Sequence, residues 1–377
     1  MNVDDMEGSP SLEVVNLVLQ KLARGEKLTS LAIGEPMYDT PEEIVNAAYE
    51  SMKAGETHYT SSYGIQPVRE AVLSKVGRKN GIKAELDNVM FITTKQAIYA
   101  SFMALAGKRS KMLLPNPGYF YTEPAQLAGF TPEHYRLNDD YSLDMNDLKS
   151  KIDGNTAAVM LNSPSNPTSK VLDRKDLEEL YEICREKGAK IISDEAYEDL
   201  VYDKKHFSLG SLEDEPDVVV SLFSLSKSYS MTGWRAGYSV ASPKITTNMA
   251  RVIEHTFTCS PPFIQKASAY ALNNGDGIIE KFRREFREKK EYVSKRLNEI
   301  DGLEANSIEG AFYAFPRYEK DVKSVQFSKD LLEKHNVAVL PGFAFGSAGE
   351  KHIRISFSGS MESLETGLGE IEKYLKN

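Results

Sequence analysis

Short runs of apolar residues alternate with longer stretches of helical period from about residue 43 to residue 270. The runs are rich in Val, Ile and Leu, and they predict strands at 89–93, 111–114, 157–161, 190–193, 218–223 and 236–240. Continuous apolar runs of this length are typical of strands that are buried on both faces. The alternation therefore predicts an α/β fold in which helices flank both sides of a mostly parallel central sheet.

The stretches between these runs have the spacing of amphipathic helices. Leu177, Leu180, Tyr181 and Cys184 follow the i, i+3, i+4, i+7 spacing that places side chains on one buried face. Helices are predicted at 43–53, 67–79, 96–106 and 174–187.

The pattern changes near Phe263. A long helical stretch with a kink at 273–277 leads into the run 281–296, whose mixed charges are typical of a solvated helix face. Strand-like pieces at 311–315, 337–340 and 352–357 and a closing helix from about Met361 follow. We predict three parts: an N-terminal segment (1–42) that joins the smaller domain, a large domain (43–270) and a small α+β domain (271–377).

The composition excludes several classes of protein. Hydrophobic residues make up 41% of the chain and charged residues 27%, so a buried core is expected and wholesale disorder is not. The formal net charge of −9 provides no general attraction to nucleic acid or to an anionic membrane. Two cysteines, Cys184 and Cys259, cannot build a disulfide scaffold or a cysteine-based zinc cluster.

The sequence also bears on targeting segments, membrane spans and metal sites. The N-terminus is acidic without the apolar run of a signal peptide, and no apolar stretch reaches the ~20 residues of a membrane span. These features predict a soluble, cytoplasmic protein. The six histidines are scattered without the spacing of metal ligands, so no metal site is predicted.

Polar residues directly follow three of the predicted strands. These segments are 162–167, 194–197 and 224–227. Each of them alone is also typical of a turn or a helix N-cap. Because ligands of open parallel sheets bind beyond the carboxyl ends of the strands, three such segments at one edge favour a ligand site.

Lys227 carries the sharpest chemical prediction. A lysine just after a buried strand lies where desolvation lowers its pKa and frees the amine for Schiff-base formation, although an ordinary surface lysine is the alternative. Ser224, Lys227 and Arg235 can together hold an anion, for which a phosphate is the natural candidate. The free amides of the helix that begins near Thr93 form a second anion site, and one phosphate held from both places reconciles the two.

These segments, in this order, resemble the signatures of class I/II aminotransferases, the fold-type I enzymes that depend on pyridoxal 5'-phosphate. The resemblance covers nearly the whole chain and is aspartate-aminotransferase-like. Its segments are Asn166-Pro167-Thr168, 194–197, 224–227 with Arg235, 31–36 with Thr40-Pro41, 58–60 with Gly64 and Val68-Arg69, 310–313, 340–342 with Phe345-Gly346, and 354–356.

The resemblance implies roles around the cofactor ring. Lys227 forms the Schiff base with pyridoxal phosphate and then moves the proton between substrate and cofactor. Asp194 pairs with the pyridine nitrogen and keeps it protonated. Asn166 and Tyr197 hydrogen-bond the 3′-oxygen of the ring. Tyr119 stacks on the ring, with Tyr121 as its rival.

The resemblance also implies how the phosphate is held. The backbone amides of Thr94 and Lys95, together with Ser224 and Arg235, hold it within one subunit. Tyr59 reaches the phosphate of the partner subunit's cofactor, which makes a homodimer the functional unit.

The substrate residues follow in the same way. Arg354 clamps the α-carboxylate bidentately, a geometry that lysine cannot supply, and Gly34 and Asn166 lie close to the same group. Lys95 matches a lysine thought to contact the distal carboxylate in one bacterial branch of aspartate aminotransferases. This match favours aspartate or another acidic donor with 2-oxoglutarate as acceptor, while aromatic amino acids and alanine stay open.

Two positions depart from the family pattern. Thr93-Thr94 stands where the phosphate loop usually carries glycine or alanine, which predicts a locally different backbone. Ser169 follows Asn-Pro-Thr where the family usually has glycine.

Two other functions remain possible on the same fold. The first is a β-lyase, whose active-site residues are almost identical. The second is a non-catalytic regulator, against which the retained Lys227, Asp194 and Arg354 argue. A nicotinamide-dependent dehydrogenase lacks support, because no Gly-x-Gly-x-x-Gly follows an early strand.

Overall fold

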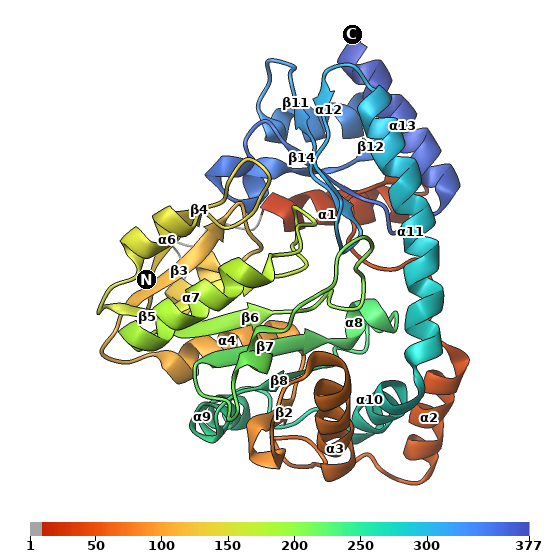
Figure 1. Cartoon of the computed structure of the whole chain (residues 1–377). Coiled ribbons are helices and arrows are strands. Elements are labelled where there is room, and N and C mark those ends of the chain that lie inside the picture. The colour runs from red at the N-terminus through yellow and green to blue at the C-terminus, as the bar shows by residue number, and fades with distance from the viewer. Residues whose placement is uncertain (1–9, 377) are drawn as a thin grey trace.

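A seven-stranded sheet forms the centre of the computed structural model, which describes residues 10–376 (Figure 1). The strand order is β2-β8-β7-β6-β5-β3-β4, and β8 alone runs against its neighbours in this sheet. The strands are β2 Val89–Phe91, β3 Lys111–Asn116, β4 Thr131–Arg136, β5 Thr156–Asn162, β6 Lys190–Asp194, β7 Val219–Ser224 and β8 Gly237–Val240. The predicted α/β architecture with a mostly parallel sheet is confirmed.

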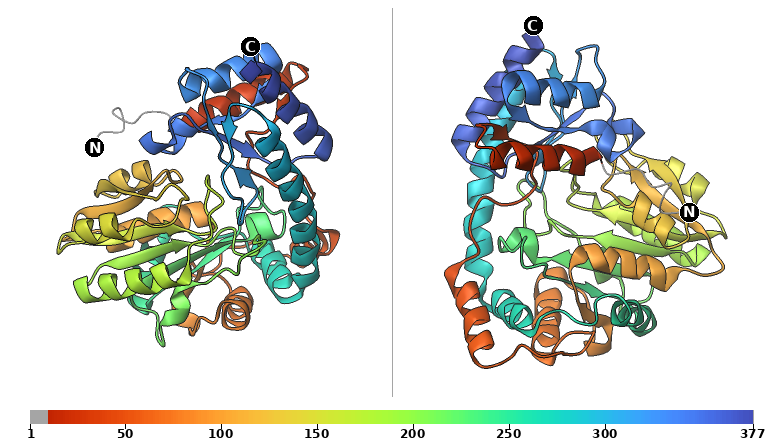
Figure 2. Two further views of the ribbon diagram at one scale, coloured as in Figure 1. Left: turned by 45° about the horizontal axis from the view of Figure 1, so that its top comes forward. Right: turned by 180° about the vertical axis from the view of Figure 1, so that it is seen from behind.

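Helices cover both faces of this sheet, as the two views of Figure 2 make clear. The helices of this part of the chain are α2 Glu42–Lys53, α3 Gln66–Lys75, α4 Thr94–Leu105, α5 Thr122–Leu127, α6 Met145–Lys151, α7 Arg174–Lys187, α8 Leu225–Ser228, α9 Pro243–Glu254 and α10 Pro262–Asn274. Of these, α2 packs against α10, and α8 lies at the carboxyl end of β7. The helix predicted at 67–79 is α3 followed by a π-helical turn over Val76–Asn80. The other three predicted helices begin and end within two residues of the prediction.

Side chains alternate between the two faces of the sheet, as the pleat of a strand requires. Val159 and Ile191 lie on one face, where they share a buried cluster with Leu180 of α7. Their neighbours Met160 and Ile192 lie on the other face, in the cluster that α4 and α9 complete. Burial on both sides explains why these strands appear in the sequence as continuous apolar runs.

The long helix α11 (Asp276–Glu299) runs from the sheet layer to a second, smaller layer (Figure 1). The predicted kink is a break at Gly275, between α10 and α11. A Cβ atom on Gly275 would collide with the ring of Tyr229 and approach the carbonyl oxygen of Ala271 to 2.5 Å. The break therefore depends on a residue without a side chain.

The second layer contains short strands and helices from both ends of the chain. They are α1 Pro10–Ala23, β1 Thr29–Ser30, β9 Leu303–Glu304, β10 Tyr313–Ala314, β11 Arg317–Tyr318, α12 Ser324–His335, β12 Val337–Ala338, β13 Leu340–Pro341, β14 Ile353–Ser356 and α13 Met361–Lys376. β14 pairs with β10 and β13, and β1 pairs in parallel with β12. The domain boundaries at 42/43 and 270/271 stay predictions. Over residues 10–376, each helix is too short or too polar to cross a membrane.

An ion pair is buried between α3 and the segment that follows β6. Lys75 donates hydrogen bonds to Glu198 and, at 2.9 Å, to Asn80 Oδ1. The side chains of Lys75 and Glu198 are only 2% and 9% exposed. Because both charges are removed from water, each depends on the other for compensation.

We expect Lys75→Met to lower the free energy of unfolding by about 3–5 kcal/mol, because it leaves the Glu198 carboxylate buried without a cation. Urea unfolding followed by circular dichroism measures the change. The control is Lys83→Met, which breaks an ion pair with Asp214 whose side chains are 68% and 91% exposed and should cost about 1 kcal/mol or less. Equal effects of the two variants would contradict the prediction.

Candidate active site

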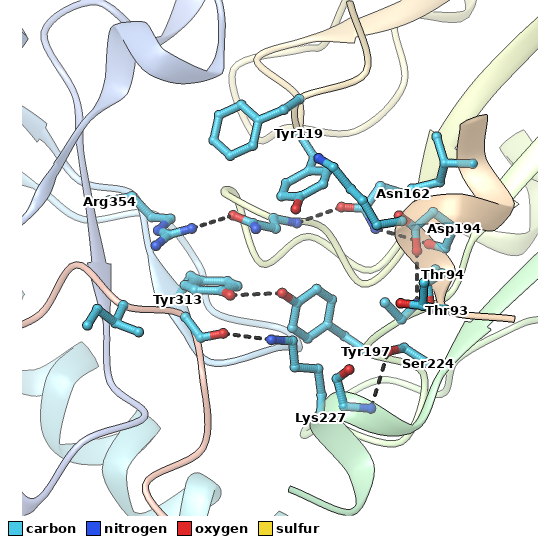
Figure 3. A pocket seen from close by; sticks show the side chains of 18 of the residues that line it. Thr93, Thr94, Tyr119, Asn162, Asp194, Tyr197, Ser224, Lys227, Tyr313 and Arg354 are labelled. Atoms are coloured by element: carbon cyan, nitrogen blue, oxygen red, sulfur yellow. Dashed lines mark hydrogen bonds between the residues drawn. The ribbon is translucent and has the colours of Figure 1, made fainter. Parts of the chain in front are cut away.

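A cavity of about 260 Å³ lies between the carboxyl ends of the central strands and the second layer (Figure 3). The register of the parallel strands brings the polar residues of this cavity together. Asn162 at the end of β5 lies beside Asp194 at the end of β6, and the neighbouring strand β7 ends at Ser224. The predicted site residues that line the cavity are Gly34, Thr94, Lys95, Tyr119, Asn166, Asp194, Tyr197, Ser224, Lys227, Arg235 and Arg354. Tyr59 does not line it.

Lys227 lies on the short helix α8, immediately after β7, and its amine points into the cavity. Nζ donates a hydrogen bond to the carbonyl oxygen of Gly34 at 2.7 Å. Burial lowers the pKa of Lys227 to about 8, and the charges of Arg354 and Arg235 act in the same direction. The amine is therefore far easier to deprotonate at neutral pH than an ordinary lysine.

This pKa predicts an unusual pH dependence for the reactivity of Lys227 in the protein without added cofactor. Only the neutral amine is nucleophilic, so its rate of acylation should rise with pH up to about 8 and then level off. An ordinary lysine continues to gain reactivity to about pH 10. Trace labelling with acetic anhydride, read by peptide mass spectrometry against a lysine model peptide, measures the profile. A profile that parallels the model peptide would contradict the prediction.

Asp194 ends β6 and is buried, with 4% of its surface exposed. Burial raises the pKa of this carboxyl to about 6, although hydrogen bonds from Tyr121 and from the amide of Ala196 oppose the shift. The Tyr121 hydroxyl donates to Oδ2 at 2.8 Å. At neutral pH most of the Asp194 side chains therefore carry a negative charge that faces the cavity.

The two rival tyrosines have different positions. Tyr119 lines the cavity, whereas Tyr121 is fully buried behind it and supports Asp194. The two rings meet edge to face, with centroids 5.5 Å apart. Of the two tyrosines, Tyr119 is therefore the one whose ring is available to a ligand, as the sequence analysis preferred. Its stacking on the cofactor stays a prediction.

The predicted phosphate site lies where the N-terminus of α4 approaches the end of β7. The Thr94 hydroxyl donates to the carbonyl oxygen of Phe223 at 2.8 Å. A Cβ atom on Gly237 of the neighbouring strand would approach Thr94 N to 2.9 Å and Phe223 O to 2.7 Å. A glycine in β8 thus gives the threonine room. Arg235, which has a positive φ of 58°, completes the site beside Ser224.

Arg354 of β14 presents a buried positive charge on the opposite wall (Figure 3). Nη1 donates to Asn166 Oδ1 at 3.1 Å and Nη2 donates to the carbonyl oxygen of Ala32. Among the side chains that the structure describes, its Nε has no hydrogen-bond partner and no carboxylate lies within 4.0 Å of the guanidinium. A buried cation that lacks an anion is suited to bind one from a ligand.

Sequence reasoning missed Asn162, Ser169 and Tyr313 as contributors to the site. Asn162 accepts from the amide of Asn166 at 2.7 Å and donates to the carbonyl oxygen of Asp194 at 3.0 Å. Ser169 takes the left-handed conformation, with φ 59°, and donates its hydroxyl to the carbonyl oxygen of Tyr313. The departure from glycine at residue 169 therefore keeps the turn and adds a hydrogen bond. The polar run 162–167 was the available signal for Asn162.

Tyr59 lies outside the cavity, with 88% of its surface exposed. Within the described chain it contributes nothing to the same subunit's site. Its predicted contact with a partner's cofactor stays a prediction.

Three possible metal ligands lie together, although the sequence spacing predicts no metal site. Ligand atoms of Glu195, Glu198 and His206 are within 4.8 Å of one another. Protein cations already face these carboxylates: Lys75 pairs with Glu198, and His206 Nε2 is 2.7 Å from Glu195 Oε2. We therefore assign no metal to this cluster.

Comparison with known proteins agrees with this geometry. The family model for aminotransferase class I and II matches residues 26–371. Aromatic-amino-acid aminotransferase 2 of Thermococcus litoralis is 38% identical over 98% of both chains, and the aspartate aminotransferase of Pyrococcus abyssi is 36% identical over 98% of this chain and 99% of its own. The structure of Thermus thermophilus aspartate aminotransferase with maleate superposes with a TM-score of 0.94 at 29% identity, covering 98% of both chains.

This chain belongs to the class I and II aminotransferases. It has the fold of the fold-type I enzymes and is a transaminase that depends on pyridoxal 5'-phosphate. The aminotransferase prediction is confirmed, and the β-lyase and the non-catalytic regulator find no support among these relatives.

The residues of the cavity fit this cofactor. An amine with a lowered pKa is available for its aldehyde, a buried carboxylate for its pyridine nitrogen, and a helix N-terminus with an arginine for its phosphate. The buried guanidinium of Arg354 lies across the cavity from these groups, where the carboxylate of an amino acid can bind.

Proposed function

We propose that this aminotransferase moves the amino group between an acidic L-amino acid, aspartate foremost, and a 2-oxo acid such as 2-oxoglutarate. The observation that carries the proposal is a pair of cations, Arg354 and Lys95, that line one cavity together with Lys227. Two cations fit the two carboxylates of a dicarboxylic substrate.

The cofactor, when bound, supplies an electron sink for the negative charge left at Cα of the substrate. Lys227 is the residue placed to take the Cα proton and to return it, since its amine is largely enclosed and easily deprotonated. Asp194 holds a proton on the pyridine nitrogen through its charge. Asn166 and Tyr197 bind the 3′-oxygen of the ring.

The phosphate is held at the end of β7. Donors for it are the backbone amides of Thr94 and Lys95, the hydroxyl of Ser224 and the guanidinium of Arg235. Tyr119 covers the face of the ring. These assignments rest on the position of each group around the cavity.

Arg354 binds the α-carboxylate. Its Nη1 and Nη2 are oriented by Asn166 and by the carbonyl oxygen of Ala32, so the guanidinium does not have to be ordered when the substrate arrives. Gly34, whose carbonyl oxygen accepts from Lys227, lies on the same side of the cavity. A preorganised guanidinium of this kind supports bidentate binding.

Lys95 binds the distal carboxylate of the substrate. Its Nζ lies 4.8 Å from the ring centroid of Tyr119 and 5.9 Å from that of Phe120. No carboxylate of the described side chains lies within 4.0 Å of this amine. The same rings, with Ile98 and Leu340, form an apolar wall that makes an aromatic donor the second candidate.

Half-reactions with single amino acids test the specificity, with the absorbance of the lysine-bound cofactor as the signal. We expect aspartate and glutamate to react faster than phenylalanine, tyrosine and alanine. Lys95→Met should slow aspartate by roughly 10- to 100-fold, since a charged hydrogen bond contributes about 1.5–3 kcal/mol, and should change phenylalanine by less than about threefold. An equal loss for both substrates, or release of ammonia without an acceptor, would contradict the proposal.

We also propose that the functional unit is a homodimer. Besides Tyr59, the exposed face of α2 carries an apolar stripe of Val45, Tyr49 and Met52, whose surfaces are 41%, 53% and 43% exposed. Contiguous exposed apolar side chains favour an interface. In the dimer, Tyr59 contacts the phosphate of the partner's cofactor. Sedimentation equilibrium of the holoenzyme tests this, and a monomer mass would contradict it.

A further inference from the structure

Tyr313 lies on β10 between the two halves of the active site, and its role is not among those assigned above. Its hydroxyl oxygen is 2.8 Å from the hydroxyl oxygen of Tyr197. The guanidinium carbon of Arg354 lies 4.4 Å from the centroid of its ring. Figure 3 shows the ring between these two side chains, with Lys227 below.

The ring is held in place by its surroundings. A Cβ atom on Gly34 would collide with the Tyr313 hydroxyl, so the backbone at Gly34 passes directly over it. The Ser169 hydroxyl donates to the main-chain carbonyl oxygen of Tyr313. Tyr313 also pairs with Ser356 on the adjacent strand β14. With 1% of its surface exposed, Tyr313 has little freedom to choose another conformation.

The pair of hydroxyl groups has a defined direction once Tyr197 binds the cofactor. A tyrosine hydroxyl has one proton to donate. If Tyr197 donates that proton to the 3′-oxygen, the hydrogen bond between the two tyrosines must be donated by Tyr313. A donor to the Tyr197 oxygen also polarises the Tyr197 hydroxyl and strengthens the bond that it donates.

We propose that Tyr313 is a positioning residue with two separable actions: its hydroxyl orients and polarises the Tyr197 hydroxyl, and its ring supports the Arg354 guanidinium. One side chain then aligns the group that binds the cofactor oxygen with the group that binds the substrate carboxylate. The inference rests on the proposed function of Tyr197 and Arg354. It adds a physical link between them.

Tyr313→Phe removes only the hydroxyl. The 3′-oxygen carries most negative charge after the neighbouring Schiff-base nitrogen has lost its proton. A weaker hydrogen bond to that oxygen therefore raises the pKa of the nitrogen. We expect the pH midpoint of the cofactor's absorbance change in the resting holoenzyme to rise by a few tenths of a pH unit to about one. Maleate affinity, measured by calorimetry, should stay within about threefold.

Tyr313→Leu removes the ring as well. It should produce the same rise of the pH midpoint and weaken maleate binding by roughly 2- to 30-fold, the range expected for a lost cation–π contact. The control is Tyr318→Phe, since Tyr318 is equally buried in the second layer and donates its hydroxyl to the carbonyl oxygen of Val322 at 2.9 Å. Neither readout should change in that variant.

A double-mutant cycle decides the mechanism. If Tyr313 acts through Tyr197, adding Tyr313→Phe to Tyr197→Phe should shift the pH midpoint no further. Additive shifts, or an unchanged midpoint in Tyr313→Phe while Tyr197→Phe moves it, would overturn the inference alone. An unchanged midpoint in Tyr197→Phe would overturn the proposed role of Tyr197 and the inference with it.

Discussion

Lys227→Ala should leave the protein folded and without covalently attached cofactor, and kcat should fall by roughly 10²- to 10⁴-fold, the usual contribution of one acid–base group. The alanine methyl group can neither join the cofactor's aldehyde nor accept the Cα proton. Borohydride reduction followed by peptide mass spectrometry measures the covalent adduct, and single-turnover kinetics measure the loss of rate.

Lys227→Arg provides the matched variant, because it retains a positive charge at the same place. Arginine is not deprotonated in proteins, so Lys227→Arg, like Lys227→Ala, should form no covalent adduct. A reduced adduct that persists in either variant at the level of the wild-type enzyme would show that another amine holds the cofactor.

Asp194→Asn should lower kcat by roughly 10²- to 10³-fold, the range found when one preorganised electrostatic contact is removed from an active site. Asparagine keeps the shape of aspartate and can still accept the hydrogen bond from Tyr121. The variant therefore removes the charge and one accepted hydrogen bond, that from the amide of Ala196. Without that charge the pKa of the pyridine nitrogen falls and the nitrogen loses its proton, so the cofactor becomes a weaker electron sink.

The control for this variant is Asp147→Asn. The Asp147 carboxylate is partly buried, with 10% of its side chain exposed, and it bonds Lys151 on α6, away from the cavity. The kcat of Asp147→Asn should stay within about twofold of the wild-type value. A small loss of kcat in Asp194→Asn, equal to that of the control, would contradict the assignment.

The fold could be predicted wherever one physical requirement governs the sequence locally. A strand buried on both faces must be apolar throughout, which is why β5 and β6 were found within a residue of their ends. β4 was missed for the opposite reason. It is one of the two edge strands of this sheet, only Tyr135 of its six residues is buried, and its pattern TPEHYR therefore lacks an apolar run.

The site could be predicted where chemistry and topology coincide. Lys227, Asp194 and Asn166 each follow a buried strand, and parallel strands bring such positions to one edge. Arg354 and Gly34 could be placed only through the family resemblance, since nothing local brings residues so far apart in the chain together. Tyr313 has no local signal of function at all, because its role comes from the two side chains that it touches.

The hydrogen bond between Arg354 and the carbonyl oxygen of Ala32 joins segments from near opposite ends of the chain. Translation must therefore pass residue 354 before the site that we propose for the substrate's carboxylate can form. The three strands whose ends line the cavity are complete by Ser224, well before that point. A nascent chain can thus contain Lys227 long before it can form the proposed substrate-binding site.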